Sequence, residues 1–214
     1  EDVEAVITSF NQGRMIREAV DSLCGQTMPP ARIIIVDDGS TDEESIGILK
    51  DIEADEKISV PVTVLRQQNG GVSSARNTGI RSAKTTMVLV LDGDDRLTPT
   101  YIEQVSTLLR KDASMVAASS WLHTFGALDR VVRPDGGSID SFLVRNCCPA
   151  THILRRKIWE RCGGYDESMR SGFEDWDFFL SMLETMPGAQ IGIAKEPLID
   201  YRTTPDSANM KSMG

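Results

Sequence analysis

Residues 32–40 read RIIIVDDGS, a run of branched aliphatic residues that ends abruptly in an acidic turn. A continuous aliphatic run is typical of a strand buried on both faces, as strands of parallel sheets are. The turn after it places Asp37 and Asp38 at the carboxyl end of that strand. In open α/β sheets ligands bind beyond this edge, so we expect a site there.

Strands and helices alternate on both sides of this run. Residues 3–8 form a short apolar segment before it, and residues 60–65, 87–91 and 115–119 are further strand candidates after it. Helical spacing of apolar residues separates these strands. The helices are indicated by Ile16, Ala19, Val20 and Leu23, by Ile46, Leu49 and Ile52, by residues 73–83, and by Ile102, Val105, Leu108 and Leu109 behind Thr98-Pro99. This alternation predicts an α/β fold with a mostly parallel, twisted sheet flanked by helices.

The second half of the chain is less regular. A turn at residues 135–137 indicates a hairpin and a surface loop over residues 131–149, and residues 163–166 form another turn. A helix begins at Glu174, and the residues that we assign to its apolar face are Trp176, Phe179, Leu180 and Leu183. No internal repeat or linker divides the chain, so we predict a single domain over residues 1–214.

The composition argues against several classes of partner. The 214 residues carry a formal net charge of -9, whereas binding to duplex nucleic acid requires a basic surface. No apolar run is long enough to span a membrane and no signal peptide is visible, so we expect a cytoplasmic protein. Any association with a membrane would come through the acceptor or through missing segments. The chain begins at Glu1 and not at Met, which indicates a piece of a longer protein.

The cysteines and histidines indicate no zinc site. Cys24, Cys147, Cys148 and Cys162 form no CxxC pair, and His123 and His152 lie far apart in the sequence. A chain of this length has enough core to need no disulfide, so we expect free buried thiols. His152 follows a Pro-Ala-Thr turn and could line the cleft, but we favour a packed or surface position.

The strongest chemical signal is Asp92-Gly93-Asp94-Asp95, which closes the strand at residues 87–91. Carboxylates this close repel one another unless a cation lies among them. Hard oxygen ligands suit Mn²⁺ or Mg²⁺ bridging a diphosphate, with phosphate and water as the other ligands. The alternative is a solvated acidic turn, but such a turn has no reason to close a buried strand. An EF-hand is excluded, because Arg96 and Leu97 stand where that loop needs a ligand and a glycine.

The acidic turn after residues 32–36 is a second candidate site. A carboxylate there can accept hydrogen bonds from a base or a ribose, or it can cap the next helix. We assign the ligand contact to Asp38, beside the other acidic cluster, and the capping role to Asp37, Ser40 and Asp42.

Two further segments belong with these. Residues 69–77 place Gly70-Gly71 before a helix, so that its free N–H groups and Arg76 would suit a ribose and its phosphates, although glycines before helices are common. Residues 174–177 supply Glu174 and Asp175 at a helix start, where one carboxylate could act as a general base or merely cap the helix. The helix N-terminus lowers such a pKa, whereas burial and neighbouring acids raise it, so the sequence leaves the sign open.

These segments together resemble the family 2 glycosyltransferases, which have the GT-A fold. Six stretches match in order over nearly the whole chain: residues 7–11, 36–42, 69–79, 91–95, 163–167 and 172–177. The resemblance implies a Rossmann-like nucleotide-sugar-binding part over residues 1–97 and an acceptor-binding part over residues 98–214.

The resemblance also implies roles for single residues. The base and ribose would be held by Thr8, Phe10, Asn11 and Asp38, and the nucleotide site would be extended by Asn69 and Arg76. In the acidic loop, Asp92 and Gly93 would reach the ribose or the metal, and Asp94 would be the main metal ligand, with Asp95 as a further one. The catalytic base would be Asp175, and Glu174 would orient the acceptor.

The implied activity is metal-dependent transfer of a sugar, with inversion, from a nucleotide-sugar such as a UDP-sugar. The acceptor would be a hydroxyl of a glycan, a lipid-linked molecule or a protein. Phe10 stands where the family usually has Tyr, and no QxxRW-type segment follows Asp177, which favours single additions over polymerisation. Two alternatives stay open. A sugar nucleotidyltransferase would carry a Gly-rich loop with Arg and Lys near residue 10, and a binding module of the same fold would have lost catalysis.

Overall fold

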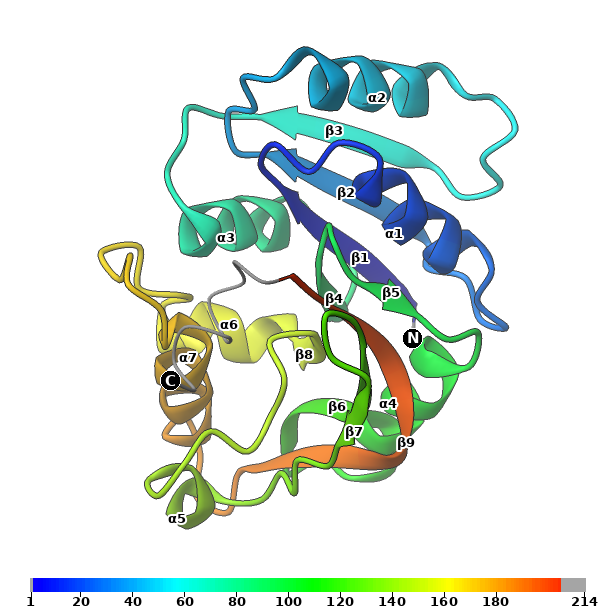
Figure 1. Cartoon of the computed structure of the whole chain (residues 1–214). Coiled ribbons are helices and arrows are strands. Elements are labelled where there is room, and N and C mark those ends of the chain that lie inside the picture. The colour runs from blue at the N-terminus through cyan, green and yellow to red at the C-terminus, as the bar shows by residue number, and fades with distance from the viewer. Residues whose placement is uncertain (1, 205–214) are drawn as a thin grey trace.

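A computed structural model describes residues 2–204 and shows one curled sheet with helices packed on both faces (Figure 1). The strand order is β3-β2-β1-β4-β8-β6-β9-β5, and β7 pairs with β6. The strands are β1 Val3–Ser9, β2 Arg32–Asp37, β3 Val62–Arg66, β4 Met87–Asp92, β5 Arg96–Leu97, β6 Met115–Gly126, β7 Arg130–Val132, β8 His152–Arg155 and β9 Gln190–Thr203. The helices are α1 Met15–Cys24, α2 Glu43–Ala54, α3 Val72–Ser82, α4 Tyr101–Lys111, α5 Ile139–Phe142, α6 Arg156–Cys162 and α7 Glu174–Leu183.

The first four strands in sequence, β1 to β4, form the parallel half that the sequence predicts. β1 lies between β2 and β4, and β2 also pairs with β3, all in parallel. The aliphatic run of β2 is buried on both faces, since Ile33 and Ile35 pack with α1 and α2 while Ile34 and Val36 pack on the side of α3. The parallel register aligns Thr8 of β1 with Asp92 of β4, so the polar ends of these strands meet at one edge.

Local sequence explains how the helices sit on this half. The four residues that we assign to the buried face of α1 are all fully buried. Asp42 caps α2, because its side chain accepts the backbone N–H of Ser45 at 2.7 Å, as expected. α3 lies very close to β1 at Gly79, where an added Cβ would stand 2.2 Å from the Cγ1 atom of Val6. Only glycine fits that contact.

The second half departs from a parallel sheet. β8 runs antiparallel between β4 and β6, β5 is antiparallel to β9, and β6 and β9 pair in parallel over most of their length. β6 continues to Gly126, beyond the strand expected at residues 115–119. It forms a hairpin with β7 that turns at residues 127–129, ahead of the hairpin expected within residues 131–149. The sheet is therefore mixed in this half. The sequence did not indicate this pairing, because strands that are distant in the sequence leave no local pattern. No helix within residues 2–204 has the length and apolar character to cross a bilayer.

Two predictions for this half need correction. The stretch at residues 131–149 is not simply a surface loop, because it contains α5 and buries Phe142, Cys147 and Cys148. α7 begins at Glu174 as predicted, but its fully buried face includes Phe178 and Met182, and Trp176 and Leu180 are only partly buried. Trp176 instead lies at the cleft, with its indole N–H bonded to the Phe142 carbonyl at 2.7 Å. The four cysteines are free, as expected, although Cys24 and Cys162 are only half-buried.

Candidate active site

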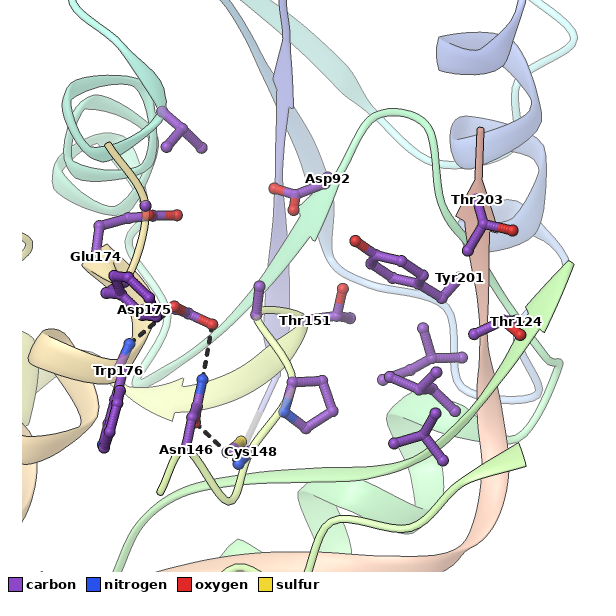
Figure 2. A pocket seen from close by; sticks show the side chains of 18 of the residues that line it. Asp92, Thr124, Asn146, Cys148, Thr151, Glu174, Asp175, Trp176, Tyr201 and Thr203 are labelled. Atoms are coloured by element: carbon purple, nitrogen blue, oxygen red, sulfur yellow. Dashed lines mark hydrogen bonds between the residues drawn. The ribbon is translucent and has the colours of Figure 1, made fainter. Parts of the chain in front are cut away.

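A cleft of about 820 Å³ opens at the carboxyl end of β4, between α7 and the strands β6 and β9. Figure 2 shows Glu174 and Asp175 of α7 on one wall, Tyr201 of β9 on the opposite wall, and Asp92 between them. Asp92 of the acidic loop and the proposed catalytic carboxylates, which are about 80 positions apart in the sequence, thus line one cavity.

A buried arginine joins the two sets of carboxylates. Arg76 of α3 is 2% exposed, and its Nη2 lies 2.9 and 3.1 Å from the two carboxylate oxygens of Asp92. Its Nη1 donates to Glu174 Oε1 at 3.1 Å. Burial alone lowers the pKa of Arg76, but the charges of Asp92 and Glu174 outweigh burial and raise it. The sequence placed Arg76 at the nucleotide, whereas the structure shows its terminal nitrogens bonded to the acidic loop and to α7.

The acidic loop adopts a conformation that requires Gly93. An added Cβ there would stand 2.0 Å from Gln12 Oε1 and 2.7 Å from the Thr8 carbonyl oxygen. The backbone N–H of Gly93 bonds to that carbonyl at 3.0 Å, and the Thr8 hydroxyl lies 3.2 Å from Asp92 Oδ1. Thr8, Asp92 and Gly93, all predicted site residues, are therefore assembled by direct contacts.

The next two carboxylates of the loop differ in their surroundings. Asp95 is buried and accepts the backbone N–H of Arg202 at 2.8 Å, while the Arg202 Nε atom donates to the Asp94 carbonyl. Asp94 is half-buried, and burial together with the charge of Asp92 raises its pKa to about 6. Burial and the neighbouring carboxylates Asp94 and Asp92 also raise the pKa of Asp95. β9 therefore holds the loop through Asp95 and leaves the Asp94 side chain as its most available ligand.

Asp92 and Asp94 of the acidic loop suit a hydrated divalent cation better than a metal ion held by protein ligands alone. Within residues 2–204, no three His, Cys, Asp or Glu side chains converge as metal ligands. The raised pKa of Asp94 reflects desolvation and its repulsion with Asp92, which a cation would relieve. Mg²⁺ is commonly held by one or two carboxylates plus substrate phosphates and water. Asp94, assisted by Asp92, has that character.

The second acidic turn is built around Asp38. Its carboxylate accepts the backbone N–H groups of Gly70 and Gly71, each at 2.8 Å, and the Gln67 side-chain amide at 2.8 Å. Gly71 has a φ of 87°, which lets the loop present both N–H groups before α3 begins. The structure thus brings together two segments that the sequence singled out, with Asp38 holding the glycine turn.

The remaining predicted nucleotide residues lie around this turn. Asn11 accepts the Thr41 backbone N–H at 2.8 Å, and its amide donates to the Thr41 hydroxyl at 3.2 Å, so it ties the end of β1 to the acidic turn. Phe10 is 47% exposed, and Asn69 is exposed as well. Asp37 accepts the Ser40 N–H at 3.0 Å and the Ser40 hydroxyl accepts the Asn11 N–H at 2.9 Å, so neither residue caps α2. Of the three residues predicted as caps, only Asp42 has that role.

The proposed base Asp175 is half-buried at the first turn of α7. One carboxylate oxygen accepts the Trp176 backbone N–H at 2.9 Å, and the other accepts the Asn146 side-chain amide at 3.0 Å (Figure 2). Burial is the largest influence on its pKa, and the charge of Glu174 acts in the same direction. Together they outweigh Arg76 and the two hydrogen bonds, so the pKa is raised. The sign that the sequence leaves open is therefore upward, toward the range of a useful general base.

Sequence reasoning missed several residues that organise the site. No sequence motif singles out Asn146, because it lies in an irregular stretch between α5 and β8. Asn77 bridges two recognised segments, accepting Trp159 Nε1–H and Tyr165 N–H while donating to the Tyr165 carbonyl. His152 is fully buried outside the lining of the cleft and lies 2.7 Å from the Ala150 carbonyl, which confirms a packed role.

A parallel first half, an acidic loop at its carboxyl edge and a mixed extension of the sheet define the GT-A class of glycosyltransferases. The model of the family "Glycosyl transferase family 2" matches residues 4–163. The chain belongs to glycosyltransferase family 2.

Known proteins agree with this assignment. The glycosyltransferase EpsJ of Bacillus subtilis is 36% identical over 104 residues, which is 49% of this chain and 29% of EpsJ. Chondroitin synthase of Escherichia coli is 26% identical over 189 residues, which is 86% of this chain and 27% of the synthase. The structure of S. aureus TarS with UDP superposes with a TM-score of 0.76 at 17% identity, covering 100% of this chain and 63% of that one, and so shows the fold. The chain spans less than two thirds of each of these proteins.

Proposed function

We propose that this domain transfers a sugar from a UDP-sugar to an acceptor hydroxyl, with inversion and with the help of a divalent cation. The bridge from Asp92 through Arg76 to Glu174 carries the proposal. It fixes the donor-side acidic loop against α7, so that Asp175 faces the same cavity as Asp92. One catalytic carboxylate and one leaving-group site in a single cleft suit direct displacement.

The proposed chemistry at the protein side is simple. Asp175 accepts the proton of the acceptor hydroxyl while that oxygen attacks the anomeric carbon from the face opposite the diphosphate. The bond from the anomeric carbon to the diphosphate oxygen breaks, and its electron pair leaves with the diphosphate. A Mn²⁺ or Mg²⁺ ion held by Asp94 and Asp92 would take up charge on that diphosphate. Glycosidases instead need a second carboxyl group as an acid.

The donor class rests on the fold. TarS shares the fold and has been crystallised with UDP and with UDP-GlcNAc. In this chain we assign the base and ribose to Thr8, Phe10, Asn11, Asp38 and Asn69. The acceptor is a glycan, a lipid-linked molecule or a protein, and single additions are proposed. The four free thiols favour a reducing compartment such as the cytoplasm.

A donor screen tests the proposal. The purified domain is incubated with a panel of UDP-, GDP- and TDP-sugars and Mn²⁺. Transfer of the sugar to water or to a simple sugar acceptor is followed by the release of the nucleoside diphosphate. We expect turnover with one UDP-sugar, and we expect a chelator to abolish that turnover. In Asp94→Ala, added Mn²⁺ should no longer increase turnover. The anomeric configuration of the first product, read by NMR, should be inverted. Tight metal-dependent binding of a donor without any turnover would instead indicate a binding module.

A further inference from the structure

Asn146 lies in the loop between α5 and β8, facing the start of α7. Its Nδ2 donates to the outer carboxylate oxygen of Asp175 at 3.0 Å (Figure 2). Within residues 2–204 no other side chain donates a hydrogen bond to that carboxylate, because its other contact is the Trp176 backbone N–H. Asn146 is exposed and lines the cleft, so the bond does not merely fill a core.

The direction of the Asn146 amide is fixed by a second bond. Its Oδ1 accepts the backbone N–H of Cys148 at 3.2 Å. A flipped amide would place oxygen against the Asp175 carboxylate and NH₂ against an N–H donor, which loses both bonds. The loop itself is anchored to α7, because the Trp176 indole donates to the Phe142 carbonyl at 2.7 Å. The amide donor is therefore presented to Asp175 in one orientation.

We propose that Asn146 is a positioning residue for the catalytic base, which holds the Asp175 carboxylate in one rotamer and keeps it ionised. The inference rests on the proposed role of Asp175. With Oδ1 bound to the backbone of α7 and Oδ2 bound to Asn146, the carboxylate plane is set by two donors from separate elements. Its remaining lone pairs are left to receive the proton of the acceptor hydroxyl.

The charged and titratable groups around Asp175 show why such a donor matters. Arg76 favours the ionised carboxylate, whereas Glu174 and burial disfavour it. Cys148 and Tyr165 also lie within electrostatic reach, and burial keeps both neutral by raising the pKa of each. Asn146 therefore adds a neutral donor that lowers the pKa of Asp175 without introducing a charge that could attract the leaving diphosphate.

Direct titration of Asp175 tests the inference independently of activity. The ¹³C chemical shift of its carboxyl group is followed against pH in protein labelled at aspartate, with the resonance assigned by its loss in Asp175→Asn. A hydrogen bond to a charged group corresponds to roughly one pKa unit, so Asn146→Ala should raise the pKa of Asp175 by about one unit. Asn146→Asp, which adds a like charge, should raise it further. Leu143→Ala, an exposed change in the same loop, should leave it where it is in the wild type.

Activity supplies the second readout, with UDP-N-acetylglucosamine or the donor found in the screen, Mn²⁺ and water as the acceptor. In Asn146→Ala the acid limb of the pH–rate profile should move upward with the pKa. The rate at high pH should stay below that of the wild type, because the carboxylate is no longer held in one rotamer. An unchanged Asp175 titration in Asn146→Ala would overturn the inference, as would a rate loss that is equal at every pH. If Asp175→Asn keeps its activity, the proposed base is wrong instead, and the two failures are thus distinguished.

Discussion

Replacing Arg76 by Met should destabilise the domain strongly, because it removes the cation between two carboxylates. The guanidinium is 2% exposed, while the side chains of Asp92 and Glu174 are 25% and 15% exposed. Breaking a buried ion pair by removing one partner costs about 3–5 kcal/mol. Since water can reach both carboxylates in part, we expect the lower end, a loss of about 3 kcal/mol in the free energy of unfolding.

Urea unfolding followed by far-ultraviolet circular dichroism measures this loss. In a domain of this length the same change corresponds to a melting temperature lower by roughly 6–12 °C. Arg81→Met is the matched control, since Arg81 is an exposed residue of the same helix that stacks over Trp159 at 5.9 Å. Its loss should cost under about 1 kcal/mol. If the two variants unfold at the same urea concentration, the buried bridge does not stabilise the fold and our reading of α3 is wrong.

Arg76→Lys separates charge from geometry. Lysine keeps the positive charge but cannot donate in parallel to both oxygens of Asp92 while reaching Glu174. We expect the free energy of unfolding to fall by an amount between those for Arg81→Met and Arg76→Met. UDP and Mn²⁺ should also bind more weakly, because Asp92 is no longer held in position. Calorimetric titration of UDP in the presence of Mn²⁺ measures the second effect. Unchanged UDP affinity in this variant would show that Arg76 does not organise the donor site.

Two further predictions concern Asp38 and His152. Asp38→Ala should weaken UDP binding by releasing the Gly70-Gly71 turn. Asp42→Ala should leave UDP affinity intact and lower the free energy of unfolding by about 1 kcal/mol, because a helix cap is lost. Calorimetry and urea unfolding would show the opposite pattern if the two acids were misassigned. Burial lowers the pKa of His152 from 6.5 to about 4. As the pH drops from 6.5 toward 4, the unfolded chain therefore binds a proton that the folded chain does not, and the free energy of unfolding falls by roughly 3 kcal/mol in all. His152→Leu should lack this fall, and parallel stability–pH curves for the two proteins would contradict it.

The parallel half of the fold could be predicted because its signals are local. The aliphatic run of residues 32–36 requires burial on both faces, and the acidic turns mark the carboxyl ends of β2 and β4. Cap residues such as Asp42 act within three positions of themselves. The mixed pairing of β8, β6 and β9 had no such signal, because it joins segments separated by about 35 positions or more.

The sequence pointed to side chains that the structure brings into one cleft, but not to the contacts between them. Asp92 and Asp175 could be placed at one edge because both follow recognisable segments. That Arg76 bonds to both Asp92 and Glu174, and not simply to a ligand, depends on how α7 packs against α3, which no local pattern reports. Asn146 stayed invisible for the same reason, since its partner is 29 positions away and its own segment is irregular.

The measurement that tests the central claim most directly is sugar transfer by Asp175→Asn. The change keeps the size and shape of the side chain and removes its basicity. We expect transfer to fall by at least ~10²-fold, the usual loss with a general base, while the affinity for UDP and Mn²⁺ stays nearly unchanged. Glu174→Gln should do less harm, mainly through acceptor binding. Near-normal transfer by Asp175→Asn would contradict the account, because the base would then be another residue.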